Sequence, residues 1–189
     1  MKVRWLAALA LACALAGCGG STPVRTDDET VSVVFGYFDM KDAPGRVDWV
    51  SLKQYGLEGK PNQSGNYQVS AKDGLFFHIG IAPGAYQVDR FGSDGGFFSN
   101  PVEYNFGGKG RNRTAVRIQK PGVYFLGAHR YVNHPGKGFF AADKFDMEPA
   151  QSPSEKELLQ RIVKQMETDK ELQPYTRQLR LAKQRLSQL

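Results

Sequence analysis

Cysteine is almost absent, and what there is lies at the start of the chain. Only Cys13 and Cys18 occur among 189 residues, so the remaining sequence offers neither a disulfide nor a free thiol. A disulfide-stabilised small scaffold is therefore excluded, as is a metal site of the Cys-x-x-Cys type. The fold must be held by its hydrophobic core, for which 12 Phe and 8 Tyr supply the material.

Long apolar runs are lacking too. The apolar run Leu6–Ala16 has eleven residues, whereas a membrane-spanning helix needs about 20. A polytopic membrane protein is excluded. The net charge is only +6 and the basic residues are spread along the chain, so nucleic-acid binding is not predicted.

The first 17 residues predict a signal peptide for export, because Lys2 and Arg4 precede the short apolar run. The run ends in Leu15–Cys18 (LAGC), which resembles the lipobox of bacterial lipoproteins. The resemblance implies that Cys18 becomes the mature N-terminus and carries diacylglycerol and a further acyl chain such as palmitate. Several acyl chains, at about 0.8 kcal/mol per buried methylene, anchor a protein firmly. Since Gly19 rather than Asp follows the cysteine, the resemblance also favours the outer membrane, facing the periplasm.

Composition divides the rest of the chain. Twenty of the 22 aromatic residues lie between Phe35 and Phe145, and no glycine follows Gly138. We therefore expect a flexible tether over 18–29, a β domain over 30–149 and helices over 152–189. Because the β part contains nearly all the aromatics, it is also expected to fold without the helices.

Period-two alternation between Pro-Gly and Asp-Gly turns predicts about eight short strands, and no helical stretch separates them. This pattern favours an antiparallel β-sandwich over a parallel sheet. The predicted strands begin near Val31, Val47, Leu75, Ala85, Phe97, Thr114, Val123 and Phe139.

Two segments carry a second resemblance. IAPGAYQVDRF (Ile81–Phe91) and VRIQKPGVYFLGAHRY (Val116–Tyr131) both place Pro-Gly before a Tyr strand. They resemble prealbumin-like sandwich domains of the carboxypeptidase-regulatory type, and are similar to bacterial lipoproteins with a domain of unknown function built on that sandwich. The resemblance covers residues 30–146. It implies a fold and a location, and no catalytic residues.

The C-terminal part predicts a helical hairpin. Ser154 and Glu157 form a capping box for the first helix, Thr168–Lys170 interrupts the pattern, and Pro174 suits the first turn of a second helix. The second helix presents an apolar seam at Tyr175, Leu179, Ala182, Leu186 and Leu189. This seam either packs on the protein's own sandwich or docks an envelope protein partner.

Motifs for catalysis and for cofactors are missing. H-E-x-x-H, G-x-S-x-G and Walker A patterns do not occur, and His78, His129 and His134 do not show a metal-ligand spacing. Pairs such as Asp143 and Asp146 have no fixed separation that would support glycoside hydrolysis. We therefore expect no cofactor, no metal and no enzymatic activity.

Two surfaces are candidates for binding. Tyr86, Arg90, His129 and Arg130 stand on neighbouring strand ends and form a conceivable site for a small ligand or glycan. The loop cations Lys109, Arg111 and Arg113 either form a solvated tip that protects a sheet edge or contact anionic lipid headgroups and envelope polymers.

The sequence thus predicts a lipid-anchored, non-enzymatic interaction or envelope-structure module, with a ligand-binding lipoprotein as the alternative. Three features separate the possibilities. A docking module exposes an apolar stripe on its terminal helices, a ligand-binding module has a concave pocket, and an enzyme brings together titratable groups with shifted pKa values.

Overall fold

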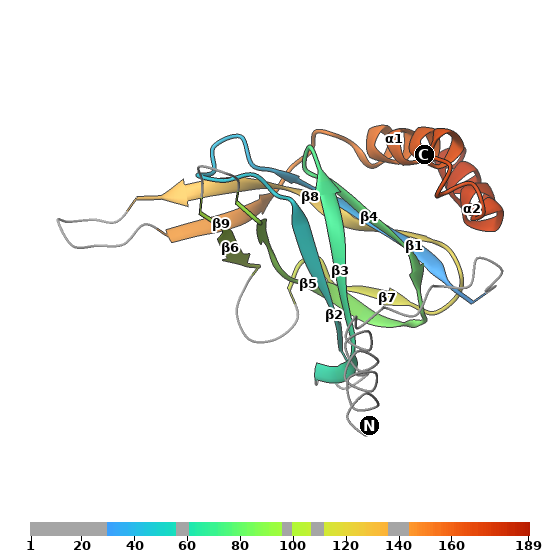
Figure 1. Ribbon diagram of the computed structural model, residues 1–189, viewed down its shortest axis with the longest axis horizontal. Coiled ribbons are helices and arrows are strands. Elements are labelled where there is room, and N and C mark those ends of the chain that lie inside the picture. The colour runs from blue at the N-terminus through green and yellow to red at the C-terminus, as the bar shows by residue number, and fades with distance from the viewer. Residues whose placement is uncertain (1–29, 56–60, 96–99, 107–111, 136–143) are drawn as a thin grey trace, which may run out of the picture.

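The computed structural model describes residues 30–55, 61–95, 100–106, 112–135 and 144–189. The predicted signal peptide, Cys18 and the tether lie outside these residues. The described chain is mainly β with two helices at its C-terminal end, as the composition predicts (Figure 1).

The strands form one curled, mixed sheet. Its order is β6-β5-β2-β3-β4-β1-β8-β9, and β7 lies beside β5. The elements are β1 (Ser32–Asp39), β2 (Trp49–Tyr55), β3 (Pro61–Lys72), β4 (Leu75–Ile81), β5 (Gly84–Ser93), β6 (Val102–Asn105), β7 (Val116–Ile118), β8 (Val123–His134), β9 (Lys144–Pro149), α1 (Glu155–Thr168) and α2 (Thr176–Leu186).

Three details depart from the sequence prediction. β1 and β8 pair in parallel, so the sheet is not wholly antiparallel. β3 was not predicted, because its segment PNQSGNYQVSAK is polar and contains Pro and Gly. The predicted strand start near Phe139 lies outside the described residues, within which β9 covers Lys144–Pro149. Pro174 precedes α2 instead of lying in its first turn.

The concave face of the sheet encloses the main core. Side chains from all nine strands meet there, and an aromatic group surrounds Phe38, whose ring centroid lies 4.5 Å from that of Phe91 and 5.2 Å from that of Phe76. Because all three rings are almost fully buried, this face contributes much of the hydrophobic stabilisation.

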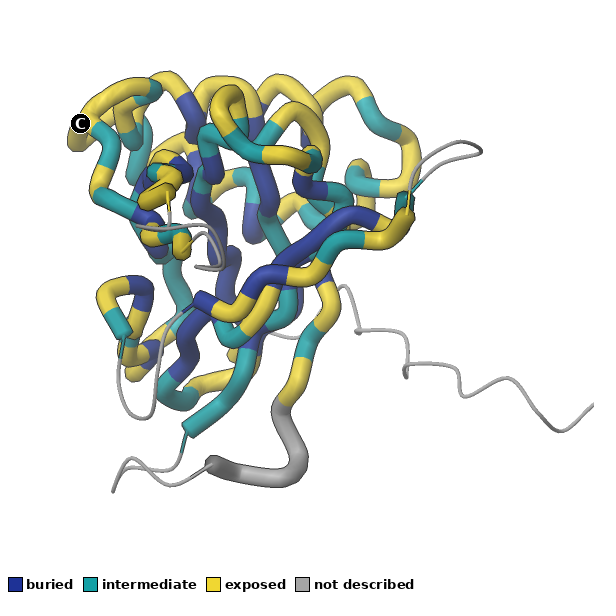
Figure 2. Tube along the Cα trace, turned by 90° about the vertical axis from the view of Figure 1, so that its left-hand side faces the viewer, coloured by how far each residue is buried: buried dark blue, intermediate teal, exposed yellow. Residues whose placement is uncertain are grey.

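The two helices cover the opposite face of β1, β4 and β8. The apolar side of α1 (Leu158, Leu159, Ile162, Val163 and Met166) packs on Val33, Phe35, Leu75 and Ile79 and forms a second core. The capping box predicted at Ser154 and Glu157 begins α1. Figure 2 shows how buried and exposed positions alternate along the helices. The helices therefore form a layer of the fold.

A hairpin between β3 and β4 positions the candidate site. Asp73 and Gly74 both have positive φ, as expected for the predicted Asp-Gly turn. β3 pairs with β4 only at Ala71–Phe76 and Lys72–Leu75, and before Ala71 it pairs with β2. The sheet therefore splits just behind the hairpin tip, and α1 lies beside the split.

Candidate functional site

A groove of about 610 Å³ occupies the split between β3 and β4. We name it the fork groove. Its size lies within the range of about 300–1,000 Å³ usual for small-ligand sites. Its lining comes from β3, the hairpin, β4 and α1 and includes Gln68, Ser70, Lys72, Phe77, His78, Arg161 and Gln165.

Two cations line the tip end of the fork groove, and a third lies beside it. Lys72 comes from the hairpin, and Arg161 comes from α1. Lys164, also from α1, joins these two in an adjoining shallow hollow of about 480 Å³. Among the described residues, no carboxylate lies within ion-pair distance of the three cations. Asp73 and Asp169 line the same surface, so its net charge remains positive.

The field of Arg161 reaches the neighbouring strand. Burial, followed by Asp39 and Asp73, raises the pKa of the Tyr37 phenol, whereas Arg161 opposes this rise. Because Arg161 also lines the fork groove, its charge acts on an anion bound there as well.

The other side chains that line the groove include both polar and apolar groups. Gln68, Ser70 and Gln165 offer amide and hydroxyl groups, and half-buried Phe77 offers a ring. His78 packs against Tyr67 with ring centroids 5.4 Å apart. Its Nε2 atom is buried and has no hydrogen-bond partner in the described structure, and burial lowers the pKa of its imidazole.

A second hollow lies on the other side of the same hairpin. It measures about 650 Å³ and contains both acids and bases. Arg46 is already paired there with Asp48 at 2.7 Å, and Asp48 also accepts from Ser93 Oγ at 2.9 Å. Because Arg46 and Asp48 already pair with each other, this second hollow offers a ligand less unpaired charge than the fork groove does.

Two of the predicted ligand-binding residues are buried in the main core. Tyr86 is 1% exposed and His129 is 4% exposed. The His129 ring contacts the rings of Phe38 and Phe106, and its Nε2 atom is 3.3 Å from the carbonyl oxygen of Leu126. Neither side chain presents a surface to a ligand in this conformation.

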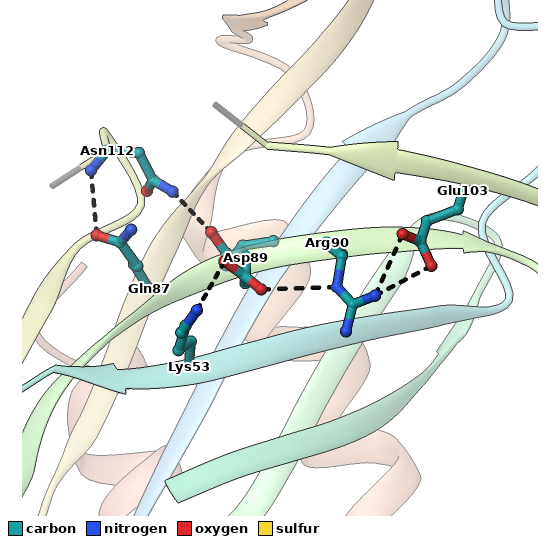
Figure 3. Close-up of polar contacts among 7 residues, drawn as sticks. Lys53, Gln87, Asp89, Arg90, Glu103 and Asn112 are labelled. Atoms are coloured by element: carbon teal, nitrogen blue, oxygen red, sulfur yellow. Dashed lines mark hydrogen bonds and ion pairs between the residues drawn. The ribbon is translucent and has the colours of Figure 1, made fainter. Parts of the chain in front are cut away.

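The two predicted arginines are exposed on separate strands and already paired. Arg90 on β5 contacts Glu103 at 3.2 Å and Asp89 at 3.6 Å (Figure 3). Arg130 on β8 contacts Glu148 at 2.8 Å. The structure thus divides the predicted set into a buried pair and two surface ion pairs.

The predicted basic loop is only partly described, because Lys109 and Arg111 lie outside the described residues. Arg113 is exposed, and its Nη1 donates to the carbonyl oxygen of Met147 at 3.2 Å. Since β9 is the last strand in the sheet order, Arg113 covers a backbone group of an edge strand. This contact fits the edge-protecting interpretation of the loop.

Sequence reasoning missed the residues of the fork groove. Lys72 directly precedes the recognised Asp-Gly turn, and Arg161 lies off the apolar face of a recognised helix. The sequence patterns already placed Lys72 next to a hairpin tip and Arg161 on a helix surface. They did not predict that the two residues lie close together, because this depends on β3, a strand that was not predicted.

Other classes of site find no support in the described residues. No group of three or more His, Cys, Asp or Glu side chains is placed to hold a metal ion there. Within the same residues, no helix combines the length and apolar character needed to cross a membrane. Comparisons with known proteins add nothing further, since no family model, curated protein or solved structure matches the chain.

The buried histidines predict acid-sensitive stability. Burial lowers the pKa of His129, with a further contribution from Arg113, and burial lowers the pKa of His78. In the unfolded chain both imidazoles titrate near the ordinary histidine pKa of 6.5, so protons bind the unfolded state preferentially below that pH. The unfolding free energy is therefore expected to keep its full value above pH 6.5 and to decrease as the pH falls below 6.5.

Urea unfolding on either side of the ordinary histidine pKa measures this effect. His129→Gln should reduce the loss of stability on acidification, whatever its effect on absolute stability. His134→Gln, at an exposed position, is the control and should leave the pH dependence as in the parent. An unchanged pH dependence in His129→Gln would contradict the role given to this histidine.

Proposed function

We propose that this chain is a non-enzymatic binding module that takes an anionic ligand in the fork groove and is held at the outer membrane by a lipid on Cys18. One observation carries the ligand part: Lys72 and Arg161, from two different elements, line one groove, Lys164 lies in the hollow beside it, and none of the three has an ion-pair partner among the described residues. Unpaired cations around a concave surface favour anions.

The state of the helix seam favours ligand binding over partner docking. Ala182 is fully buried, and Tyr175, Leu179 and Leu186 pack against the second core. Among the described large apolar side chains, only Leu189 is exposed, at 40%. Since the apolar stripe is mostly used inside the protein, an envelope partner would have to use another surface.

The other parts of the proposal rest on the sequence. The lipobox-like segment Leu15–Cys18 and the following Gly19 support lipid anchoring on the periplasmic side of the outer membrane. The kinship with prealbumin-like sandwiches is likewise proposed. The two halves of the curled sheet around one core support it, while the parallel pairing of β1 with β8 departs from a wholly antiparallel sandwich.

Anion binding is tested by NMR titration of the mature chain with inorganic phosphate and with acetate. Saturable shifts are expected at amides around Lys72, Phe77 and Arg161. Arg161→Gln should lower the affinity by about tenfold, which corresponds to about 1.4 kcal/mol. Loss of one of the converging cations removes a charge-assisted contact.

Arg180→Gln is the matched control, because Arg180 is exposed on α2 and does not line the groove. This variant should bind both anions as the parent does. Shifts scattered over all exposed cations, and equally weakened by either substitution, would count against a site in the fork groove.

Lipid attachment has its own test. Mass spectrometry of the protein purified from membranes should find an acylated cysteine at the mature N-terminus, and Cys18→Ser should leave the chain unprocessed or release it from the membrane. Cys13→Ser is the control, because Cys13 would leave with the signal peptide. A mature chain that begins at another residue without lipid would refute the anchor.

A further inference from the structure

The fork groove borders a strand edge that lacks a neighbouring strand. β4 pairs with β1 from Leu75 to Ile81, but along its other edge the pairing with β3 stops at Phe76. Beyond Phe76, within the described residues, β3 no longer pairs with this edge, and Phe77 and His78 line the groove. A sheet edge that presents unpaired backbone groups is a template for a further strand.

The hydrogen-bond pattern indicates which backbone groups face the groove. The Phe38 N–H donates to the Gly74 carbonyl oxygen at 2.9 Å, and the register continues regularly to Val34 opposite His78. In antiparallel pairs, successive residues point their backbone groups to alternate sides. The N–H and C=O groups of Phe77 and Ile79 therefore point away from β1, on the side where β3 has left β4 and where Phe77 lines the groove.

Charge distinguishes the two ends of this free edge. The hairpin end holds Lys72 and Arg161, with Asp73 as the single acid among the groove-lining residues. The edge from Phe77 to Ile81 is long enough for about four residues of an extended chain at ~3.3 Å per residue. A peptide that ran antiparallel to β4 would finish at the cations.

We propose that the fork groove binds the carboxyl-terminal end of an extended peptide, which adds as a short strand to the free edge of β4 and places its terminal carboxylate between Lys72 and Arg161. Main-chain hydrogen bonds to Phe77 and Ile79 supply affinity, and capture of the carboxylate fixes the register. The proposal rests on the anion site described above, and it names the ligand as a peptide terminus.

The side-chain requirements of such a peptide are modest. Gln68, Ser70 and Gln165 offer polar contacts along the walls, and half-buried Phe77 offers an apolar one. Recognition through the backbone and the carboxylate tolerates many sequences, so a randomised library is the suitable probe. An acidic sugar in the same groove would use the cations and the amides but not the edge of β4.

The experiment is selection of the mature protein against a synthetic library of peptides with random C-terminal residues, prepared once with free carboxylates and once as amides. Selected carboxylates are expected to bind at least about tenfold more tightly than their amides. Arg161→Gln and Lys72→Gln should each weaken binding, whereas Arg180→Gln should not. N-methylation at alternate peptide positions should abolish binding only where the N–H faces β4.

Slowed hydrogen exchange of the Phe77 and Ile79 amides on binding would support strand addition. Equal affinity of carboxylates and amides, or insensitivity to N-methylation at every position, would overturn it, as would a library that yields no binder. If phosphate and acetate still bind in the groove, the anion site stands and only the peptide proposal fails. If neither anion binds there, the proposed function fails as well.

Discussion

Ile162→Ala is expected to lower the free energy of unfolding by about 2–5 kcal/mol, which is the usual cost of truncating a buried aliphatic side chain. Ile162 is fully buried between α1 and the outer face of the sheet. Removing three carbons there loses contacts with β1 and β4 and leaves a cavity. Urea unfolding followed by circular dichroism measures the change.

Gln160→Ala is the matched control, because Gln160 is exposed on the same helix and alanine favours helix. Its effect should stay within about 0.5 kcal/mol. Equal stability of Ile162→Ala and the parent would mean that the helices do not share the core of the sheet in solution.

The second core also changes the expectation for truncation. The aromatic content of residues 30–146 predicts independent folding, yet Val33, Phe35 and Ile79 are buried under the helices. A chain ending at Ala150 would expose this apolar face and is therefore expected to aggregate. A soluble, cooperatively melting product would restore the first expectation.

Local signals in the sequence were reliable wherever they depend on neighbouring residues. The capping box at Ser154 needs only Glu157 three residues later, and the turn at Asp73 needs only the glycine that follows. Likewise, the apolar period of α1 identifies the five side chains that it buries. Each of these features forms through contacts within one element or one turn.

Long-range features escaped prediction for a physical reason. β3 owes its conformation to hydrogen bonds with β2 along most of its length, which outweigh the weak strand propensity of its polar sequence. The parallel pair of β1 with β8 joins segments about ninety residues apart, and alternation alone does not encode strand direction.

The candidate site depends on those same features. The fork groove exists because β3 leaves β4 after two paired residues, and no local pattern indicates where a ladder ends. Predictions based on strand ends placed Tyr86 and His129 together with Arg90 and Arg130. Both aromatic side chains instead follow the inward-facing alternation and fill the core.

Phe38→Ala is expected to have the largest effect of any single substitution considered, about 3–5 kcal/mol. The Phe38 ring is 1% exposed and contacts the rings of Phe76, Phe91 and Phe106. Aromatic contacts of this kind add to the loss from area burial. Because small domains are stable by only about 5–15 kcal/mol, the variant should melt at a much lower temperature.

Phe125→Ala is the comparison, since Phe125 is only half-buried and packs against Phe35 in the second core, with ring centroids 5.0 Å apart. This variant should lose clearly less stability than Phe38→Ala. Phe38→Ala also tests whether stability and anion binding depend on different parts of the fold. Its backbone N–H holds the Gly74 carbonyl, a bond that alanine retains, and its ring lies away from the fork groove. At low temperature, folded Phe38→Ala should therefore bind acetate with the parental affinity. A variant that keeps parental stability would contradict the central position of Phe38, and one that folds but fails to bind would contradict the separation of core and groove.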